Sequence, residues 1–391
     1  MAGEAHPTSG VPRVVDGEEL RVRRELFDIP EGVVYLDGNS LGAPPKHVAE
    51  RMQEVIRHQW GTRLIRSWSE GWWEAPQRIG DRIGRLIGAA EGQVVVGDST
   101  SVNVFKALMG AVKGTDRTEI VCDESTFPTD GYIAQSVATL AGLKIRAAHL
   151  SSLDLTDETA VVLINHVDYR TGALNDMKAL TEQAHDAGAQ VVWDLCHSAG
   201  VLPIELDALG VDYAVGCTYK FLNGGPGSPA FIYVPKHKQA GFENPLSGWN
   251  GHREPFAMEP SYEPDPGIVR ARVGTPDILS MLALDAALDV WDDVDLAELR
   301  QRGLALTASF REHVEKLTRL EVITPEVRGN QISVRCPDAK AVMDELIARG
   351  VIGDHRPPDV LRFGFAPLYV TDDDVIRAAE VLAEVVSGIT R

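Results

Sequence analysis

Residues 217–227 follow an apolar run and contain a lysine flanked by two aromatic residues. They read Cys217-Thr218-Tyr219-Lys220-Phe221-Leu222-Asn223-Gly224-Gly225-Pro226-Gly227. An amine in apolar, partly buried surroundings loses affinity for its proton and becomes nucleophilic. Glycines let the backbone pass close to a bound ligand. The ordinary alternative is an exposed lysine at the end of a strand. The neighbouring aromatic residues and glycines favour the reactive lysine over this alternative. The pattern predicts a reactive Lys220 at the end of a strand.

Around this lysine the chain alternates short β-branched runs with longer amphipathic segments. This alternation is typical of a mostly parallel sheet with helices on both faces. Seven runs have strand character: residues 94–96, 119–122, 144–147, 161–165, 190–194, 213–215 and 230–234. The sequence therefore predicts an α/β domain with a seven-stranded sheet.

After an ordered loop at residues 245–266, rich in Gly, Pro and aromatic residues, the pattern changes to that of a smaller α+β domain. Strand-like runs at 331–336 and 360–365 flank a predicted helix at 339–349. An earlier helix is indicated by apolar residues at helical spacing: Leu299, Leu306, Phe310, Val314 and Leu317. The expected division is an N-terminal arm at 1–50 that packs on the small domain, a large domain at 51–285 and a small domain at 286–391.

The composition of the chain favours some classes of protein and argues against others. The 391 residues are 44% hydrophobic and 24% charged, with a formal net charge of -19, which favours a soluble protein and argues against a nucleic-acid partner. Residues 1–11 lack the pattern of a secretory signal, and no apolar run approaches the roughly 20 residues that span a bilayer. The four cysteines lack paired metal-ligand spacing and fit small buried side chains in a reducing cytoplasm: Cys122, Cys196, Cys217 and Cys336.

Three more motifs carry polar or aromatic groups at places where parallel sheets bind ligands. Asp98-Ser99-Thr100-Ser101-Val102-Asn103 precedes an apolar helix, so its hydroxyls and free N–H groups suit a phosphate, although a simple helix cap explains it equally well. Phe127-Pro128-Thr129-Asp130 follows a strand, and its aromatic ring could stack on a ligand or belong to the core. Val191-Val192-Trp193-Asp194-Leu195-Cys196-His197 places a carboxylate at a strand's carboxyl end, for which an ion pair or a helix cap is the alternative.

Together the motifs supply what an aromatic aldehyde phosphate needs for binding. Lys220 offers the amine, Asp194 an anion beside a pyridine nitrogen, Phe127 a stacking ring, and Thr100 and Ser101 the phosphate donors. Neither His185 nor His197 has a partner at metal-ligand spacing, so no metal site is expected.

At this point the sequence resembles the kynureninase family, which belongs to the fold type I, aspartate aminotransferase-like enzymes that use pyridoxal 5'-phosphate. The resemblance spans the chain from about residue 20 almost to its end. Six motifs carry it: Tyr35-Leu-Asp-Gly-Asn-Ser-Leu-Gly42, Phe127-Pro-Thr-Asp130, Asp194-Leu-Cys-His197, Tyr219-Lys-Phe-Leu-Asn-Gly-Gly-Pro-Gly227, Leu246-Ser-Gly-Trp-Asn-Gly-His252 and Arg362-Phe-Gly-Phe-Ala-Pro-Leu-Tyr369.

The resemblance implies a role for individual residues. Lys220 would bond covalently to the cofactor, Asp194 would pair with its pyridine nitrogen, and Tyr219 would assist proton transfer near the phosphate. The implied cofactor-binding set is Thr100, Ser101, Phe127, Pro128, Thr129, Asp130, Asn165, Asp194, His197, Tyr219, Lys220, Trp249 and Thr275. The implied substrate-binding set is Arg362, which would clamp the α-carboxylate, together with Trp68, Asn39 and Ser40.

The resemblance also implies the reaction, a hydrolytic cleavage of L-kynurenine to anthranilate and L-alanine in tryptophan breakdown. Trp68 matches an aromatic residue of the bacterial-type enzymes, which implies a weaker reaction with 3-hydroxykynurenine. Because residues such as Trp249 and Thr275 reach across a dimer interface in this fold, a homodimer with active sites at the interface is implied. The sequence departs from the family at Asn250, where Phe is frequent, and relatives vary at Asn165 and Thr275.

Three other functions remain as alternatives. A cysteine desulfurase shares the fold but needs a mobile nucleophilic cysteine near the substrate. An aminotransferase would share Lys220, Asp194 and Arg362, and an assay with a keto-acid acceptor distinguishes it. A non-catalytic cofactor-binding regulator would add a DNA-binding module, for which the chain has neither the length nor a basic patch.

Overall fold

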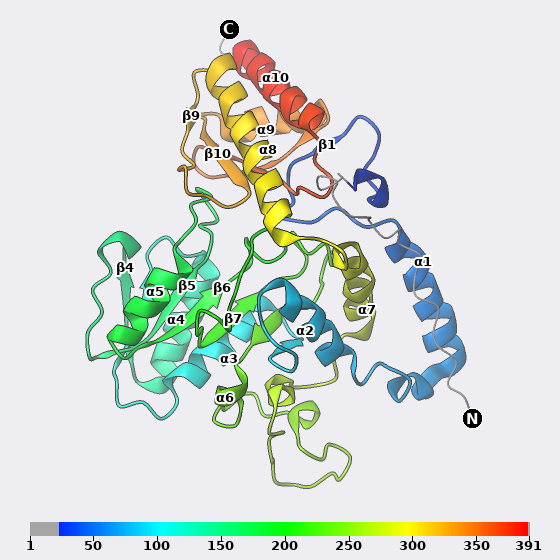
Figure 1. Cartoon of the computed structure of the whole chain (residues 1–391), viewed down its shortest axis with the longest axis vertical. Coiled ribbons are helices and arrows are strands. Elements are labelled where there is room, and N and C mark those ends of the chain that lie inside the picture. Colours follow the sequence, from blue (N-terminus) through cyan, green and yellow to red (C-terminus); the bar gives the residue numbers. More distant parts are fainter. Residues whose placement is uncertain (1–22, 390–391) are drawn as a thin grey trace.

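A seven-stranded sheet lies at the centre of the structure, a computed structural model that describes residues 23–389 (Figure 1). Its strands are β2 (Val94–Val96), β3 (Glu119–Asp123), β4 (Lys144–Ala148), β5 (Thr159–Asn165), β6 (Gln190–Asp194), β7 (Tyr213–Gly216) and β8 (Phe231–Tyr233). They pair in the order β2-β8-β7-β6-β5-β3-β4. Only β8 runs antiparallel to its neighbours in this sheet. The predicted seven-stranded, mostly parallel sheet is confirmed.

Helices cover both faces of this sheet, because successive residues of its strands point to opposite sides and both sides are apolar. Val161 and Val162, for example, belong to two different hydrophobic clusters. Helices α3 (Thr100–Val112) and α4 (Pro128–Ala141) contribute to one cluster. The other cluster contains residues of α2 (Ala75–Leu86), α5 (Met177–Asp186) and α7 (Ile278–Ala287). The short α6 (Lys236–Gln239) follows β8.

A second, antiparallel sheet lies in the C-terminal part of the chain, in the order β12-β13-β10-β9. Its strands are β9 (Glu321–Val322), β10 (Gln331–Arg335), β12 (Asp354–Arg356) and β13 (Val360–Gly364). Helices α8 (Leu296–Leu317), α9 (Ala339–Ala348) and α10 (Asp372–Ile389) lie beside it (Figure 1). The predicted C-terminal helices and strands are confirmed, although Leu317 is exposed at the end of α8. Strands β9 and β12 were not predicted, because a strand of two or three residues is too short to show a periodic pattern.

The segment before the large sheet contacts both parts of the molecule. β1 (Val34–Tyr35) pairs in parallel with β11 (Val351–Ile352), and Arg24 Nη1 lies 2.8 Å from Asp374 Oδ2 at α10. α1 (His47–Glu54) then packs beside α7 and continues into a π-helical segment at Val55–Arg63, at the side of the molecule in Figure 1. Residues 1–22, which include the predicted start of the arm and residues 1–11, lie outside the described residues. The division of the chain at residues 50 and 285 stays a prediction.

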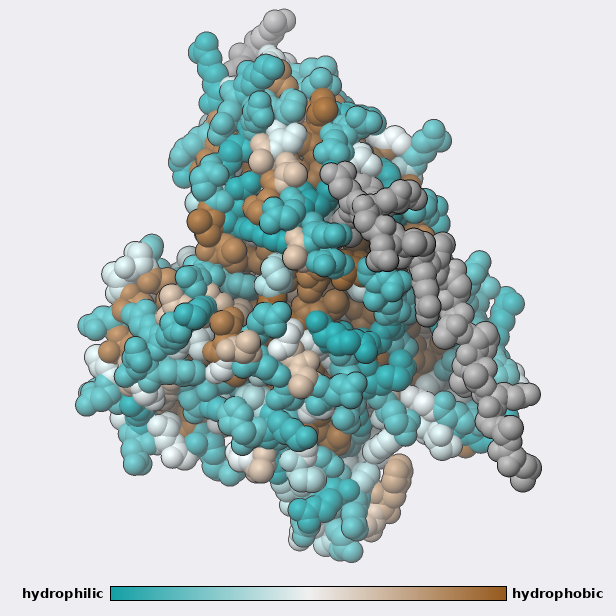
Figure 2. All heavy atoms as spheres, viewed as in Figure 1, coloured by the Kyte–Doolittle hydropathy of each residue, from teal (hydrophilic) through white to brown (hydrophobic). Residues whose placement is uncertain are grey.

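The carboxyl edge of the large sheet faces the C-terminal part. Arg362 of β13 donates from Nη1 to the carbonyl oxygen of Tyr169, which follows β5, at 2.5 Å. The space-filling view shows hydrophobic residues at the waist between the two parts (Figure 2). Ligands of open parallel sheets bind at this edge, so the predicted site lies between the two sheets. Within residues 23–389, no helix has the length and apolar character needed to cross a membrane.

Candidate active site

Lys220 lies in the turn that follows β7, partly buried and held by its backbone. Its carbonyl oxygen accepts from the Asn223 N–H at 2.9 Å, and the preceding carbonyl, of Tyr219, accepts from the Gly42 N–H at 2.8 Å. A Cβ atom at Gly42 would overlap the Lys220 carbonyl oxygen, so only glycine allows residues 35–42 to pack on this turn. The motif at residues 35–42 therefore supports the lysine turn directly.

The Lys220 ammonium donates to Nε2 of His197 at 3.0 Å. Burial lowers the pKa of Lys220, but negative charge on the surrounding side chains, chiefly Cys217 and Cys196, raises it by more, so the pKa lies above its ordinary value. The expectation that the surroundings weaken this base is thus wrong, because acidic groups outweigh burial. Burial and the Lys220 charge together hold the pKa of His197 well below its usual range, so the imidazole is neutral and accepts the bond.

Asp194 ends β6 and lies beside a second carboxylate. Its Oδ1 accepts from the Cys196 N–H and its Oδ2 accepts from Asn165 Nδ2, both at 2.7 Å. The same Asn165 amide donates to Asp130 Oδ2 at 3.0 Å. Burial, followed by repulsion from Asp194, raises the pKa of Asp130 well above its ordinary range. Asp194 accepts one hydrogen bond on each of its two oxygens, an arrangement that suits a carboxylate beside a pyridine nitrogen.

A cavity of about 450 Å³ opens at the start of α3 and contains several of the predicted phosphate donors. Ser99 caps this helix by accepting from the Val102 N–H at 3.4 Å, and the other N–H groups of the first turn, those of Thr100 and Ser101, are suited to bind an anion. Ten residues besides Thr100 and Tyr219 line the cavity: Gly97, Asp98, Ser99, Ser101, Gly227, Ser228, Pro229, Ala230, Asp277 and Ser280. The structure therefore brings Thr100, Ser101 and Tyr219 together.

Phe127 precedes α4 at the end of β3, and its ring is 42% exposed. The ring meets Tyr169 edge to face, with centroids 5.2 Å apart. Pro128 and Thr129 begin the first turn of α4, where proline is tolerated because the N–H that it lacks would have no partner in the helix. An aromatic ring this exposed at the carboxyl edge is free to cover a flat ligand.

Arg362 is 1% exposed in the structure and contacts three other residues. Its Nε donates to Asp354 Oδ1 at 2.7 Å, its Nη2 donates to Ser40 Oγ at 3.1 Å, and its Nη1 bonds to Tyr169 as described above. Asn39, by contrast, is buried and donates from Nδ2 to Gln331 Oε1 at 3.0 Å. Ser40 thus lies at the predicted carboxylate clamp, whereas Asn39 binds a neighbouring strand.

Trp68 and Trp249 lie in an aromatic group, which a further tryptophan, Trp73, connects. The centroid of Trp73 lies 6.5 Å from that of Trp68, 5.5 Å from that of Trp249 and 5.2 Å from that of Phe256. Neither predicted tryptophan lines the cavity at Tyr219, and Thr275 lines a different cavity, next to Asn103. Within one chain, these three predicted residues are therefore not assembled with Tyr219 at the start of α3.

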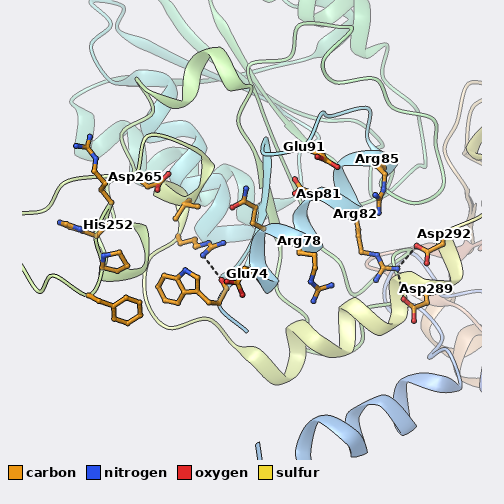
Figure 3. Close-up of a pocket in the computed structure, with 17 residues that line it drawn as sticks. Glu74, Arg78, Asp81, Arg82, Arg85, Glu91, His252, Asp265, Asp289 and Asp292 are labelled. Atoms are coloured by element: carbon orange, nitrogen blue, oxygen red, sulfur yellow. Dashed lines mark hydrogen bonds and ion pairs between the residues drawn. The ribbon is translucent and has the colours of Figure 1, made fainter. Parts of the chain in front are cut away.

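A cavity of about 930 Å³ is lined by none of the predicted residues, although Trp73 and Phe256, which line it, belong to the aromatic group of Trp249. Figure 3 shows it bordered by charged side chains of α2, with Arg82 turned toward Asp289 and Asp292. Arg82 Nη2 lies 3.0 Å from Asp289 Oδ1 and 2.9 Å from Asp292 Oδ1. No lysine is among the described residues that line this groove, so it offers no amine like that of Lys220.

The residues at the carboxyl edge fit the cofactor that the motifs predict. His197 Nδ1 is buried without a hydrogen-bond partner among residues 23–389, next to the amine of Lys220. A neutral imidazole, an anionic carboxylate, a helix N-terminus and an exposed aromatic ring meet the needs of an aromatic aldehyde phosphate. No group of three or more His, Cys, Asp or Glu side chains that could hold a metal ion occurs in the described part of the chain.

The sequence analysis overlooked four residues of this edge. Tyr169, Asp354, Arg356 and Asp37 surround Arg362 or approach it, and the first three stand in no motif that could have indicated them. Asp37 does lie within the motif at residues 35–42, where the analysis selected Asn39 and Ser40 instead. Only the pairing of β12 with β13 places Asp354 opposite Arg362.

Comparison with known proteins identifies the relatives of this chain. A model of the kynureninase C-terminal domain matches residues 299–382. A kynureninase of Burkholderia pseudomallei (strain 1106a) is 49% identical over 388 residues, which cover 94% of this chain and 92% of that protein. The chain belongs to the kynureninase family. A kynureninase of Deinococcus radiodurans is 47% identical over 387 residues, 95% of this chain and 94% of that protein.

Solved structures that resemble this member of the kynureninase family include proteins named for other activities. A cysteine desulfurase of Thermococcus onnurineus NA1 superposes with a TM-score of 0.80 at 20% identity and covers 96% of this chain and 100% of that one. The cystine C–S lyase C-DES, in complex with cysteine persulfide, has a TM-score of 0.81 at 17% identity over 90% and 98% of the two chains. These similarities establish the aspartate aminotransferase-like fold. The four cysteines are all buried in this chain.

Proposed function

We propose that the protein is a kynureninase that uses pyridoxal 5'-phosphate to cleave L-kynurenine hydrolytically to anthranilate and L-alanine, in tryptophan degradation. The observation that carries the proposal is the meeting of Lys220, Asp194 and Arg362 at one sheet edge in a chain of this family. The bound cofactor supplies an electron sink for the carbanion that forms at the substrate's α-carbon. A cytoplasmic location accords with four buried free thiols.

The side chains at this edge divide the work between binding and proton transfer. Arg362 would hold the α-carboxylate, and the amine of Lys220 would take the α-proton. Burial raises the pKa of Tyr219 to about 12, so its phenol keeps its proton at neutral pH and can deliver it during cleavage. Asp194 would pair with the pyridine nitrogen of the cofactor, and the aromatic side chain of Phe127 would help to hold its ring.

The direct experiment incubates the cofactor-loaded protein with L-kynurenine and follows the fluorescence of released anthranilate. A parallel reaction with 3-hydroxykynurenine tests whether Trp68 disfavours the extra hydroxyl, in which case that reaction is slower. A loaded protein that releases no anthranilate would overturn the substrate assignment while leaving the fold intact. A keto-acid acceptor in a third reaction reveals any aminotransferase activity.

Arg362→Lys is expected to raise KM for L-kynurenine about tenfold with a small change in kcat, because lysine keeps the charge but loses the planar fork. Lysine is a less disruptive choice than alanine, since removal of the cation would deprive Asp354 of the hydrogen bonds that it accepts from Arg362. Steady-state rates with L-kynurenine give both constants. An unchanged KM would exclude Arg362 as the carboxylate clamp.

We further propose a homodimer in which Trp249 and Thr275 of one subunit complete the active site of the other. Supporting this arrangement, Trp249 is 39% exposed and Phe256 70% exposed on the loop at residues 245–266. Ile65 and Trp60, beside α1, are also exposed, at 77% and 54%. Apolar side chains gathered on a surface in this way mark an interface between chains.

Mixing two inactive variants tests this arrangement. In a reassembled mixture of Lys220→Ala and Trp249→Ala subunits, a mixed dimer has one site with both residues intact, so about one quarter of all sites should regain activity. The readout is anthranilate release before and after subunit exchange, with each variant alone as the control. No recovery in verified mixed dimers would place Trp249 in the site of its own chain.

A further inference from the structure

Two carboxylates and two guanidinium groups meet behind the candidate carboxylate clamp. Arg362 binds Asp354 side-on, with Nε on Oδ1 at 2.7 Å and Nη2 on Oδ2. Arg356 Nη2 lies 3.0 Å from the same Oδ2, and Ser40 Oγ donates to it at 2.6 Å. The fourth charged group, Asp37, interacts with all three of the others. Ionised together, the four groups carry no net charge.

Asp37 differs from Asp354 in its hydrogen bonds. Oδ1 of Asp37 is buried and has no hydrogen-bond partner among residues 23–389, whereas both oxygens of Asp354 accept from Arg362. Burial, followed by repulsion from Asp354, raises the pKa of Asp37 to about 7, although Ser40 and both arginines lower it. Burial also acts on Asp354, but the bonds from Arg362 outweigh it and lower that pKa. The titratable groups facing Asp37 from elsewhere are the phenols of Tyr35 and Tyr369.

A substrate α-carboxylate on Arg362 would be the third anion beside two cations. A low-dielectric site disfavours a net charge, so one carboxylate must become neutral when the substrate binds. Asp354 would have to release the guanidinium to accept a proton. Asp37 can accept one on an oxygen that has no other partner.

We propose that Asp37 takes up one proton from solvent when an α-carboxylate binds Arg362, and thereby sets the pH range in which the enzyme binds its amino acid substrate. The inference rests on the proposed function, in which Arg362 is the carboxylate clamp. Only a proton moves, from water to a carboxylate oxygen, and no other bond is made or broken. Asp37 is thus a positioning residue that acts on the substrate through Arg362 and Asp354.

The direction in which pH changes the affinity for a carboxylate follows from the protonation state of Asp37 in the free enzyme. Below about pH 7, Asp37 is already protonated in the free enzyme, so a carboxylate binds without proton exchange. Above that pH, binding must recruit a proton, and affinity falls about tenfold per pH unit. Asp37→Asn, which is neutral at every pH, should bind with an affinity independent of pH in this range.

The experiment measures binding to the cofactor-loaded protein of a kynurenine analogue that lacks the α-amine, because the substrate amine itself titrates. Calorimetry in two buffers of different ionisation enthalpy counts the protons taken up, between about pH 6 and about pH 9. The control variant is Asp123→Asn, since Asp123 is also buried with a raised pKa but bonds to Ser125. We expect uptake to approach one proton above pH 7 in the wild type and control, and none in Asp37→Asn.

The variant Asp354→Asn provides a second, independent test of the proposal. With position 354 neutral, the substrate carboxylate is only the second anion beside two cations, so Asp37 need not take up a proton and the affinity of this variant should no longer fall above pH 7. Binding that depends on Arg362 but is independent of pH and takes up no proton in the wild type would overturn the inference alone. No binding at any pH would overturn the clamp assignment and the inference with it.

Discussion

Lys220→Ala is expected to lower the rate of anthranilate release by at least about 10⁴-fold, the largest effect of any single substitution in the chain. Alanine removes both the amine that bonds to the cofactor and the base that takes the α-proton. The side chain occupies a partly buried position beside His197, and no other lysine lies in the motifs at this edge. The measurements are the turnover rate and the visible absorption of the bound cofactor, which should lose the band of the lysine adduct.

Lys220→Arg separates charge from chemistry at the same position. Arginine keeps a cation beside His197 but cannot form the covalent bond, so this variant should be as inactive as alanine. The exposed Lys178 of α5 offers a matched control, since its side chain is 68% exposed and pairs with Glu182 on the same helix. An adduct band and full turnover in Lys220→Ala would refute the assigned role.

Asp194→Asn should lower kcat by about 10³-fold, with little effect on KM. The amide has nearly the shape of the carboxylate but no charge, so the pyridine nitrogen is no longer held protonated and the ring withdraws electrons poorly. The free energy of unfolding should change less than in a cavity-forming variant, because no volume is lost. Single-turnover rates with L-kynurenine measure the chemical step directly.

Asp212→Asn is the control for this substitution. Asp212 is equally buried but lies at the opposite edge of the sheet, where it accepts from the Val191 N–H at 2.8 Å and pairs with Lys238 at 2.6 Å. The control should lose stability and keep its kcat. Equal losses of kcat in the two variants would mean that Asp194 acts through the fold rather than through the cofactor.

The fold was predictable wherever the chain repeats a pattern over enough residues. β5 and β6 are runs of apolar residues bounded by turns, and the buried residues of α8, such as Leu306 and Phe310, recur at helical spacing. The two-residue strands β1 and β11 show no such repeat, because they exist only through their pairing with one another. The local sequence indicates a strand only when the strand has enough residues for its apolar run, or the alternation of its two faces, to be recognised.

The sequence by itself determined the order of the reactive groups. Lys220, Asp194 and Phe127 each follow an apolar strand, and strands of a parallel sheet end at a common edge, so their side chains had to come together there. The sequence likewise determines the glycine at position 42 and the turn at residues 223–227.

Only the tertiary structure decided the electrostatic state of these groups. Lys220 keeps a raised pKa because acidic side chains from its own turn, such as Cys217, and from the end of β6, such as Cys196, together outweigh its burial. The pairing of β12 with β13 brings Asp354 onto Arg362, and the pairing of β1 with β11 leads the chain to Asp37 behind it. Charge interactions depend on distance in space and on exclusion of water, and neither quantity can be read along the chain.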